Sequence, residues 1–408
     1  MSSRPPLRPL DDALADLLVR ARPLPATEDV PTYQADGRVL AEDLVSALQV
    51  PPQDNSSMDG YAVRSAEIAG EGVLLPVSQR IAAGQSGLPL QPGTAARIFT
   101  GAPVPQGADA IVMQEDAQPV GDHAVRIQRV PGPGQWIRRR GEDVQRGAVV
   151  LQRGHRLDPA ACGLAAGIGR AKVRVAPRPK VAMFSTGDEL VMPGTVAPEA
   201  MRPGAIYNSN RFFLRQLLVR CGCEVSDLGI VPDQREATVA ALSEAASAHD
   251  VILTSGGVSV GEEDHIKPAV QQLGSLDLWQ IAMKPGKPFA YGTVGSAHFI
   301  GLPGNPVSSF VTFLLLVRPF LLRLQGTTRV QPAAIQLPAQ FDWSRPDKRR
   351  EFLRVRRNGA GGLDLFPNQS SGVLTSTVWA DGLLDNPGNQ AIRRGDLVRF
   401  LPLSEFLA

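Results

Sequence analysis

Apolar residues first recur with a clear period at residues 8–22, where they fall every three or four positions. They are Leu10, Leu14, Leu17 and Leu18. Aspartates occupy the first turn of this stretch and arginines the last, which suits the partial charges at the two ends of a helix. The spacing therefore predicts an amphipathic helix.

Two later regions consist of short apolar runs separated by glycine and proline. One extends from about residue 51 to residue 145 and includes Ala110–Met113 and Ala124–Ile127. The other begins near residue 331. Short runs with frequent turn residues are typical of β structure. The sequence therefore predicts a β-rich domain in the N-terminal half and a small β domain at the end.

Strand-like and helical patterns alternate between these two regions, beginning after residues 177–179. The apolar runs lie at 181–184, 223–230 and 251–253, and the helical stretches at 211–220, 235–248 and 264–273. Such alternation predicts βαβ units, with a parallel sheet covered by helices on both faces. The most apolar window, residues 310–324, is shorter than the ~20 residues that a membrane span needs, so we expect a buried helix there.

Composition and charge narrow the functional classes. A chain of 408 residues is long enough for several domains. Its net charge of +2, from 42 basic and 40 acidic residues, supplies no strong field for nucleic acid or an anionic membrane. The N-terminus lacks the apolar core of a secretory signal. The three cysteines are an odd number without metal-like spacing, so we expect buried thiols in a reducing cytoplasm.

Candidate chemistry is concentrated after the run at 251–253, which ends in Ser255-Gly256-Gly257. A strand that ends in glycines and leads into a helix can present backbone N–H groups to an anion. Lys284 and Lys287, set among prolines, add positive charge. Asp264, at the start of the next predicted helix, would repel an anion unless a metal ion lay between them. The pattern predicts a site for a phosphorylated ligand with magnesium.

Each of these features also has an ordinary structural interpretation. A glycine pair can be a simple turn, and most lysines are only solvated. The position at a strand end favours a site, because Glu189 and Asp233 follow neighbouring strands, whose carboxyl ends meet at one edge of the sheet. By contrast, residues 208–210 are as consistent with a helix cap as with a ligand contact. Residues 54–62, 99–105 and 138–143 would remain unassigned loops on physical grounds alone.

Eight motifs in order along the chain resemble those of the molybdopterin molybdenumtransferase (MoeA) family, which includes the C-terminal domain of gephyrin. They are Ser57-Met58-Asp59-Gly60-Tyr61-Ala62, Thr100-Gly101-Ala102-Pro103, Arg140-Gly141-Glu142-Asp143, Ser185-Thr186-Gly187-Asp188-Glu189-Leu190, Asn208-Ser209-Asn210, the segment from Ser255 to Gly261, Lys284-Pro285-Gly286-Lys287-Pro288 and Gly301-Leu302-Pro303-Gly304-Asn305-Pro306. The resemblance covers essentially the whole chain.

The resemblance implies an α/β plus β, multi-domain fold with a central doubly wound parallel sheet of the molybdopterin-binding type. The implied domains are a linking and dimerisation domain (1–45 and 141–177), a β-rich domain (46–140), an α/β domain (178–326) and a C-terminal β-barrel (327–408). It also implies a cytoplasmic homodimer. The implied reaction inserts molybdate into adenylylated molybdopterin, with Mg²⁺ present, and releases AMP.

The resemblance assigns roles to particular residues. Asp59, Thr100, Glu189 and Asp264 are implied to be catalytic, and Asp233 and Asp264 to bind the metal. The implied substrate-binding residues are Asp143, Ser255, Gly256, Gly257, Lys284, Lys287 and Ser371. In the family, the wall with Asp264 faces Asp59 and Thr100 of the other subunit. Gln234 and Glu262 depart from the family pattern, so only Asp233 of its loop receives a metal role.

Two other functions share part of these features. A molybdopterin adenylyltransferase would have the α/β domain with its Ser-Gly-Gly turn, but not the Asp59 and Thr100 segments or the last β domain. Such an enzyme is also a candidate partner, because it makes the adenylylated pterin. A non-enzymatic, gephyrin-like scaffold is the second alternative. No side-chain nucleophile is evident, so molybdate or water is the expected source of the attacking oxygen.

Overall fold

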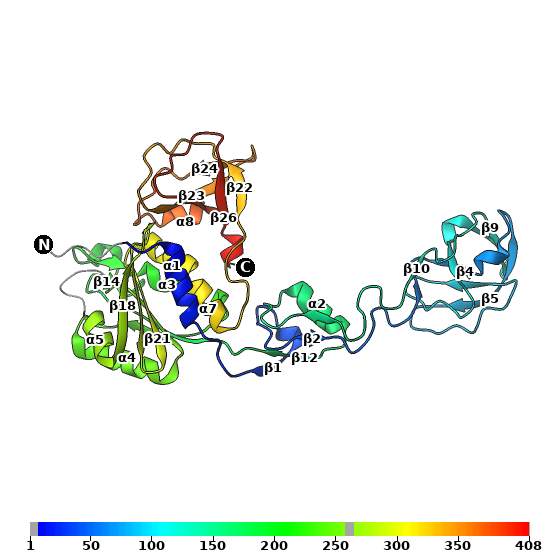
Figure 1. Ribbon diagram of the computed structural model, residues 1–408, viewed down its shortest axis with the longest axis horizontal. Coiled ribbons are helices and arrows are strands. Elements are labelled where there is room, and N and C mark those ends of the chain that lie inside the picture. Colours follow the sequence, from blue (N-terminus) through cyan, green and yellow to red (C-terminus); the bar gives the residue numbers. More distant parts are fainter. Residues whose placement is uncertain (1–6, 258–264, 408) are drawn as a thin grey trace.

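The computed structural model describes residues 7–257 and 265–407. The molecule is elongated, with an α/β unit and a C-terminal β unit at one end of its long axis and a separate β-rich unit at the other (Figure 1). A slender linking region lies between them. The first and last described residues, 7 and 407, both lie near the α/β unit.

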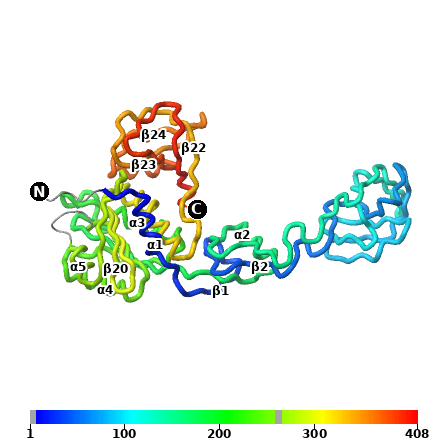
Figure 2. The backbone as a smooth tube through the Cα atoms, in the orientation of Figure 1, coloured from blue at the N-terminus to red at the C-terminus, as the bar shows by residue number. Residues whose placement is uncertain are grey.

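The chain passes through the linking region twice. It leaves through β1 (Glu28–Pro31), a 3₁₀ turn (Thr32–Gln34) and β2 (Leu44–Val45), and returns through β11 (Val149–Leu151), α2 (Pro159–Gly167) and β12 (Lys172–Val175). Strands β1 and β12 pair antiparallel, as do β2 and β11, so the outgoing and returning segments run side by side (Figure 2).

The predicted amphipathic helix is α1 (Leu10–Arg20). Leu10, Leu14 and Leu17 are buried in one core with strands of the α/β unit. The predicted linking domain includes this helix, because it spans residues 1–45. The helix nevertheless packs on the α/β unit. Its apolar face is buried in that core, as expected for an amphipathic helix at the surface of a domain. The residue ranges of the four domains stay predictions.

The β-rich unit confirms the expectation from the short apolar runs. Its six-stranded sheet has the order β7-β4-β6-β5-β9-β8. The strands are β4 (Gly60–Val63), β5 (Leu74–Ile81), β6 (Ala95–Ile98), β7 (Ala110–Met113), β8 (Ala117–Val120) and β9 (Ala124–Ile127), with 3₁₀ turns at Ser65–Glu67 and Gln114–Asp116. The short strands β3 (Asn55–Ser56) and β10 (Ile137–Arg138) pair where the unit joins the link.

The α/β unit has a mixed sheet of order β16-β13-β17-β21-β20-β18. Its strands are β13 (Lys180–Ser185), β16 (Glu224–Ile230), β17 (Val251–Ser255), β18 (Gly274–Gln280), β20 (Pro288–Val294) and β21 (Ala297–Leu302). The first four in the order are parallel, but β20 pairs antiparallel with both of its neighbours. The predicted parallel sheet is thus confirmed for these four strands, whereas the edge with β20 and β18 is antiparallel, because a tight turn at Gly295 reverses the chain and no helix crosses over.

Helices cover both faces of this sheet, as predicted. One face packs against α1, α3 (Ser209–Arg220) and the helix at 306–324, and the other against α4 (Arg235–Ala248) and α5 (Ile266–Leu273). Two short strands, β14 (Leu190–Val191) and β15 (Ile206–Tyr207), and a 3₁₀ turn at Pro198–Ala200 lie beside it.

The helix at 306–324 consists of α6 (Pro306–Thr312), the π-helical turn η5 (Phe313–Val317) and α7 (Arg318–Leu324). By length and composition it could cross a membrane, but 89% of its most apolar window is buried inside the protein. It is a core helix, which confirms the interpretation of residues 310–324.

The C-terminal unit is a small barrel, as expected. Its strand order is β19-β23-β25-β26-β22, with β24 paired to β23. A bridge between Ala339 and Leu363 brings β24 next to β22 and closes the ring. The elements are β22 (Ile335–Pro338), β23 (Arg350–Arg357), β24 (Leu363–Leu365), β25 (Gly382–Asn386), β26 (Leu397–Pro402), α8 (Thr375–Trp379) and α9 (Ser404–Leu407). Strand β19 (Met283–Lys284) comes from the α/β unit, so the two units share one sheet edge.

The cysteines fit the expectation of buried thiols at two positions. Cys221 and Cys223 are buried, whereas Cys162 is only partly buried. Burial raises the pKa of the Cys221 thiol to about 11. Because the thiolate is the reactive form, this side chain is inert at neutral pH.

Candidate functional site

A cleft of about 790 Å³ opens at the carboxyl ends of strands β13, β16 and β17. Most of its wall belongs to the α/β unit, and Gly372 of the C-terminal barrel completes it. The residues that line it are Thr186, Gly187, Glu189, Leu190, Ile206, Tyr207, Asn208, Ser209, Asn210, Asp233, Ser255, Gly256, Gly257, Pro288, Pro303, Gly304, Asn305, Pro306, Ser308 and Gly372. The structure thus brings together the predicted Glu189, Asp233 and glycine turn.

The glycine turn forms the floor of the cleft. Gly256 and Gly257 have φ values of +93° and +64°, and a Cβ on Gly256 would lie 2.8 Å from the backbone oxygen of Thr186. Side chains other than hydrogen are therefore excluded here. The Gly256 N–H donates to the backbone oxygen of Leu302 at 3.1 Å, so this N–H is already engaged within the protein.

Asn210 holds this turn in place. Its Nδ2 donates to Ser255 Oγ at 2.8 Å and to the backbone oxygen of Gly304 at 2.7 Å. It thereby joins the ends of two parallel strands beneath the cleft. The neighbouring Asn208 accepts the Arg211 N–H at 3.2 Å and caps α3, which confirms the helix-cap interpretation of residues 208–210; a ligand contact by this segment stays a prediction.

The carboxylates of Glu189 and Asp233 provide hard oxygen ligands in the lining of the cleft. Glu189 folds back over Gly187, where an added Cβ would lie 2.5 Å from its Oε2. Mg²⁺ usually takes one or two carboxylates, with substrate phosphates and water completing its shell, so this donor set fits magnesium. Within residues 7–257 and 265–407, no group of three His, Cys, Asp or Glu side chains could hold a metal ion. Asp264, the other predicted metal ligand, lies outside the described residues.

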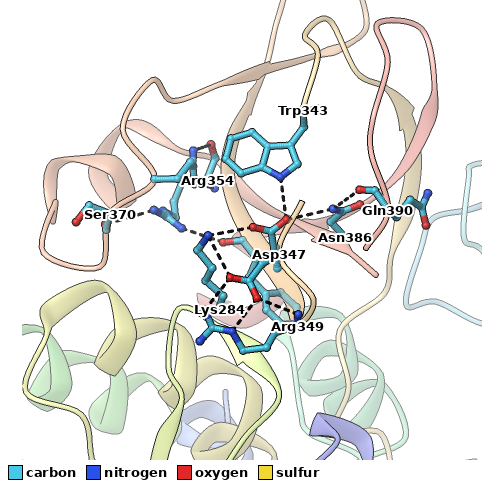
Figure 3. A network of polar contacts seen from close by, with 11 residues as sticks. Lys284, Trp343, Asp347, Arg349, Arg354, Ser370, Asn386 and Gln390 are labelled. Atoms are coloured by element: carbon cyan, nitrogen blue, oxygen red, sulfur yellow. Dashed lines mark hydrogen bonds and ion pairs between the residues drawn. The ribbon is translucent and has the colours of Figure 1, made fainter. Parts of the chain in front are cut away.

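The two predicted anion-binding lysines differ in their surroundings. Lys284 Nζ lies 3.4 Å from Glu351 Oε1 and 3.6 Å from Asp347 Oδ2, both in the barrel (Figure 3). Lys287 is half-buried, and its side chain has no hydrogen bond or ion pair with any residue that the structure describes. Among the described residues, Lys284 thus has carboxylate partners and Lys287 has none. The motif Lys284-Pro285-Gly286-Lys287-Pro288 did not predict this difference.

Asp59 and Thr100 lie together in the β-rich unit. The Thr100 N–H and hydroxyl both donate to Asp59 Oδ1 at 2.8 Å. The Thr100 N–H, with smaller help from its hydroxyl and from Arg97, holds the pKa of Asp59 below its usual value. This pair lies at the opposite end of the long axis from the cleft, so the same chain does not bring it to Glu189 and Asp233 (Figure 1).

Asp143 and Ser371 occupy different places relative to the cleft. Asp143 is exposed in the link, where its N–H donates to the backbone oxygen of Val50 at 3.0 Å. The backbone oxygen of Ser371 accepts the N–H of Val307 at 3.0 Å, which places it at the edge of the cleft next to Gly372. Asn305 stands at the N-cap position of α6, but its side chain makes no capping bond.

Arg354 is a residue near the site that sequence reasoning missed. It is only 1% exposed, and its guanidinium donates to Ser376 Oγ and to the backbone oxygens of Phe352 and Ser370. Burial lowers its pKa to about 10, so it is still charged at neutral pH. No carboxylate pairs with it among the described residues. In sequence it is one of several arginines in β23, and nothing there distinguishes it from a solvated one.

Three family models match the chain in order. The model of the MoeA N-terminal region (domain I and II) matches residues 8–169, and that of a probable molybdopterin binding domain matches 182–323. The model of the MoeA C-terminal region (domain IV) matches 336–403.

Two relatives of similar sequence are named as molybdopterin molybdenumtransferases. The molybdopterin molybdenumtransferase of Haemophilus influenzae is 44% identical over 319 residues, which is 78% of each chain. Molybdopterin molybdenumtransferase 2 of Mycobacterium tuberculosis is 39% identical over 389 residues, or 92% of this chain and 93% of its own length. The crystal structure of the molybdopterin biosynthesis MoeA protein of Pyrococcus horikoshii is 29% identical, covers 97% of this chain and 100% of its own, and has a TM-score of 0.84.

Proposed function

The chain belongs to the MoeA family of molybdopterin molybdenumtransferases, and we propose how its cleft uses a molybdopterin-derived substrate. It is a transferase of molybdenum cofactor biosynthesis. We propose that its substrates are adenylylated molybdopterin and molybdate, and that it releases AMP as molybdenum enters the dithiolene of the pterin. The observation that carries this proposal is the assembly of Glu189, Asp233 and the Ser255–Gly257 turn in one cleft.

The cleft residues suit an anionic substrate that must lose AMP by cleavage of a phosphate bond. The glycine turn lets the substrate approach the backbone closely, and Asn210 keeps that turn rigid. We propose that Lys287, which directly precedes the cleft residue Pro288, supplies a positive charge for the phosphate or for molybdate. We propose that Asp233 and Asp264 hold Mg²⁺, which would supply charge stabilisation for the phosphate bond that breaks.

The cleft supports a direct mechanism without a covalent enzyme intermediate. Hydroxyl groups of Ser209, Ser255 and Ser308 line it, but a histidine is not among the described residues that do. A serine without an adjacent base is a weak nucleophile. We therefore propose that an oxygen of molybdate or water attacks the phosphorus atom, and that Glu189 orients this oxygen.

We further propose that two chains form a homodimer in the cytoplasm and share each site. The supporting observation is the separation of the Asp59 and Thr100 pair from the cleft within one chain (Figure 1). In a two-fold symmetric dimer, the β-rich unit of one subunit can cover the cleft of the other. An exposed cleft that must exclude water would gain its lid in this way.

Release of AMP tests the proposed reaction. The purified protein is incubated with adenylylated molybdopterin, Mg²⁺ and molybdate, and we expect AMP together with a molybdenum-containing pterin. A reaction without molybdate is the control for simple hydrolysis. If the protein instead consumes ATP and molybdopterin to make the adenylylated pterin, it is an adenylyltransferase. If it does neither, the proposal is wrong.

Replacing Lys287 with alanine should weaken anion binding. A charge-assisted contact contributes ~1.5–3 kcal/mol, so the dissociation constant for molybdate or for the pterin should rise roughly tenfold to a hundredfold. Isothermal titration calorimetry measures it. Lys172→Ala, an exposed lysine in β12 of the linking region, is the matched control. Equal affinity of Lys287→Ala and wild type for both ligands would show that Lys287 is only solvated.

A further inference from the structure

A compact polar network joins the Lys284 loop to the barrel (Figure 3). Glu351 is fully buried, and its Oε2 accepts the Trp343 Nε1–H at 2.8 Å and an Asn386 N–H at 3.4 Å. Its other oxygen, Oε1, faces Lys284 Nζ at 3.4 Å. Asp347 faces the same ammonium group at 3.6 Å. Two carboxylates of the C-terminal unit therefore surround a lysine of the α/β unit.

The backbone of the Lys284 loop is fixed without this ion pair. Met283 and Lys284 pair with Arg350 and Glu351 in parallel strands, and the Arg350 N–H donates to the Ala282 oxygen at 3.1 Å. Gly286 has a φ of +106°, and a Cβ there would lie 2.3 Å from Thr312 Oγ1. Since main-chain bonds and close packing already hold the loop, the carboxylates determine where the ammonium group lies rather than where the loop lies.

The ion pairs of Lys284 are loose. Both distances exceed the ~2.7–2.9 Å of a tight charged hydrogen bond, and the lysine side chain is 41% exposed. Asp347 also accepts the Arg349 N–H and two guanidinium bonds, which hold its pKa far below the usual value. Both carboxylates therefore keep other donors if the lysine leaves. The pair with Asp347 is partly exposed and therefore weak. Glu351 is buried, but its bonds from Trp343 and Asn386 remain when a bound oxyanion draws the ammonium group away.

We propose that Asp347 and Glu351 are positioning residues that compete with the bound anion for Lys284. In the free protein they hold the ammonium group at the barrel, and Lys284 transfers to the anion when it binds. This inference rests on the proposed function for the class of ligand, a tetrahedral oxyanion such as molybdate. It makes the C-terminal barrel a determinant of anion affinity, although the described residues of the barrel add only Gly372 to the cleft wall.

A double-mutant cycle with molybdate as the only ligand tests the competition. Glu351→Gln removes the charge but keeps an acceptor for Trp343, and we expect it to tighten molybdate binding about threefold to fivefold, the range for releasing a weak ion pair. Asp347→Asn should act in the same direction. In a Lys284→Gln background, which itself binds molybdate more weakly, both substitutions should have no further effect. Isothermal titration calorimetry gives each affinity.

Control variants distinguish an effect that acts through Lys284 from a general effect of removing a negative charge. Asp381→Asn removes a carboxylate paired with Arg357 at the other end of β23 and should leave molybdate affinity unchanged. Equal tightening by Glu351→Gln with and without Lys284 would overturn the inference, because the lost charge would then act on the anion directly. Weaker binding in Glu351→Gln and Asp347→Asn would also overturn it, since the carboxylates would then only support the site.

Molybdate binding and AMP release together show whether only this inference fails or the proposed function fails as well. If wild type releases AMP but Lys284→Gln binds molybdate normally, Lys284 does not contact the anion, and only the inference fails. If wild type neither binds molybdate nor releases AMP, the proposed function fails as well. Melting temperatures of all variants confirm that each is folded.

Discussion

A mixed dimer with Asp59→Ala in one subunit and Asp233→Ala in the other is expected to release AMP at about half the wild-type rate, although each parent homodimer is inactive. The reason is the separation of the two residues in one chain, since Asp59 lies at the far end of the long axis from the cleft that Asp233 lines (Figure 1). If each site takes Asp59 from the partner, one cleft collects both substitutions and the other is intact.

The reciprocal mixed dimer is the matched control. It has both substitutions in one subunit and none in the other. With shared sites, each of its clefts has one lesion and the dimer is inactive, whereas sites built within single chains would leave one intact cleft and half activity. Differently tagged, co-expressed subunits allow both species to be purified. Half activity in the reciprocal species, with none in the first, would refute the shared site.

Asp233→Asn is expected to reduce turnover by about a hundredfold to a thousandfold. The proposed role of Asp233 is to hold the metal that stabilises charge as the phosphate bond breaks, and losing one such interaction has effects of this size on kcat. Binding of the pterin should change little, because the lost interaction acts mainly in the transition state. The residual activity should also require more Mg²⁺ for half-saturation than wild type does.

A nearby carboxylate gives the control for this prediction. Glu236, in the first turn of α4, is exposed and only three residues away. Glu236→Gln makes the same change in charge outside the cleft and should retain wild-type turnover. Single-turnover AMP release, with pterin affinity measured separately, compares the two variants. Wild-type turnover in Asp233→Asn would exclude a metal or catalytic role for this side chain.

Local elements of the fold are well predicted from the sequence. Helix α4 spans the predicted residues 235–248, because a run of residues with high helix propensity favours a helix without help from distant contacts. The buried strand β17 and the helix at 306–324 are equally evident from apolar runs. Strand direction at the far edge of the sheet was not predictable in this way. It depends on whether a connection crosses over or turns back, and short patterns do not encode that.

For the cleft, too, the sequence predicted local features but not long-range contacts. The sequence places Glu189, Asp233 and the glycine turn at neighbouring strand ends, and the structure brings them together. The partners of Lys284 lie more than sixty residues further along the chain, in a different unit. The pairing of the Gly256 N–H with Leu302 and the burial of Arg354 likewise depend on long-range packing. Which groups are already engaged is therefore a property of the tertiary structure.

The paired course of the chain through the link makes the β-rich unit an inserted module. The Val50 N–H donates to the Val144 oxygen at 2.8 Å, and the Ser46 N–H to the Ala148 oxygen at 3.0 Å, so the segment between them begins and ends at one place. Domain insertions succeed at such sites because the host chain continues with little disturbance. This unit could thus be exchanged between relatives as one cassette, which would change the Asp59 side of the site without altering the cleft.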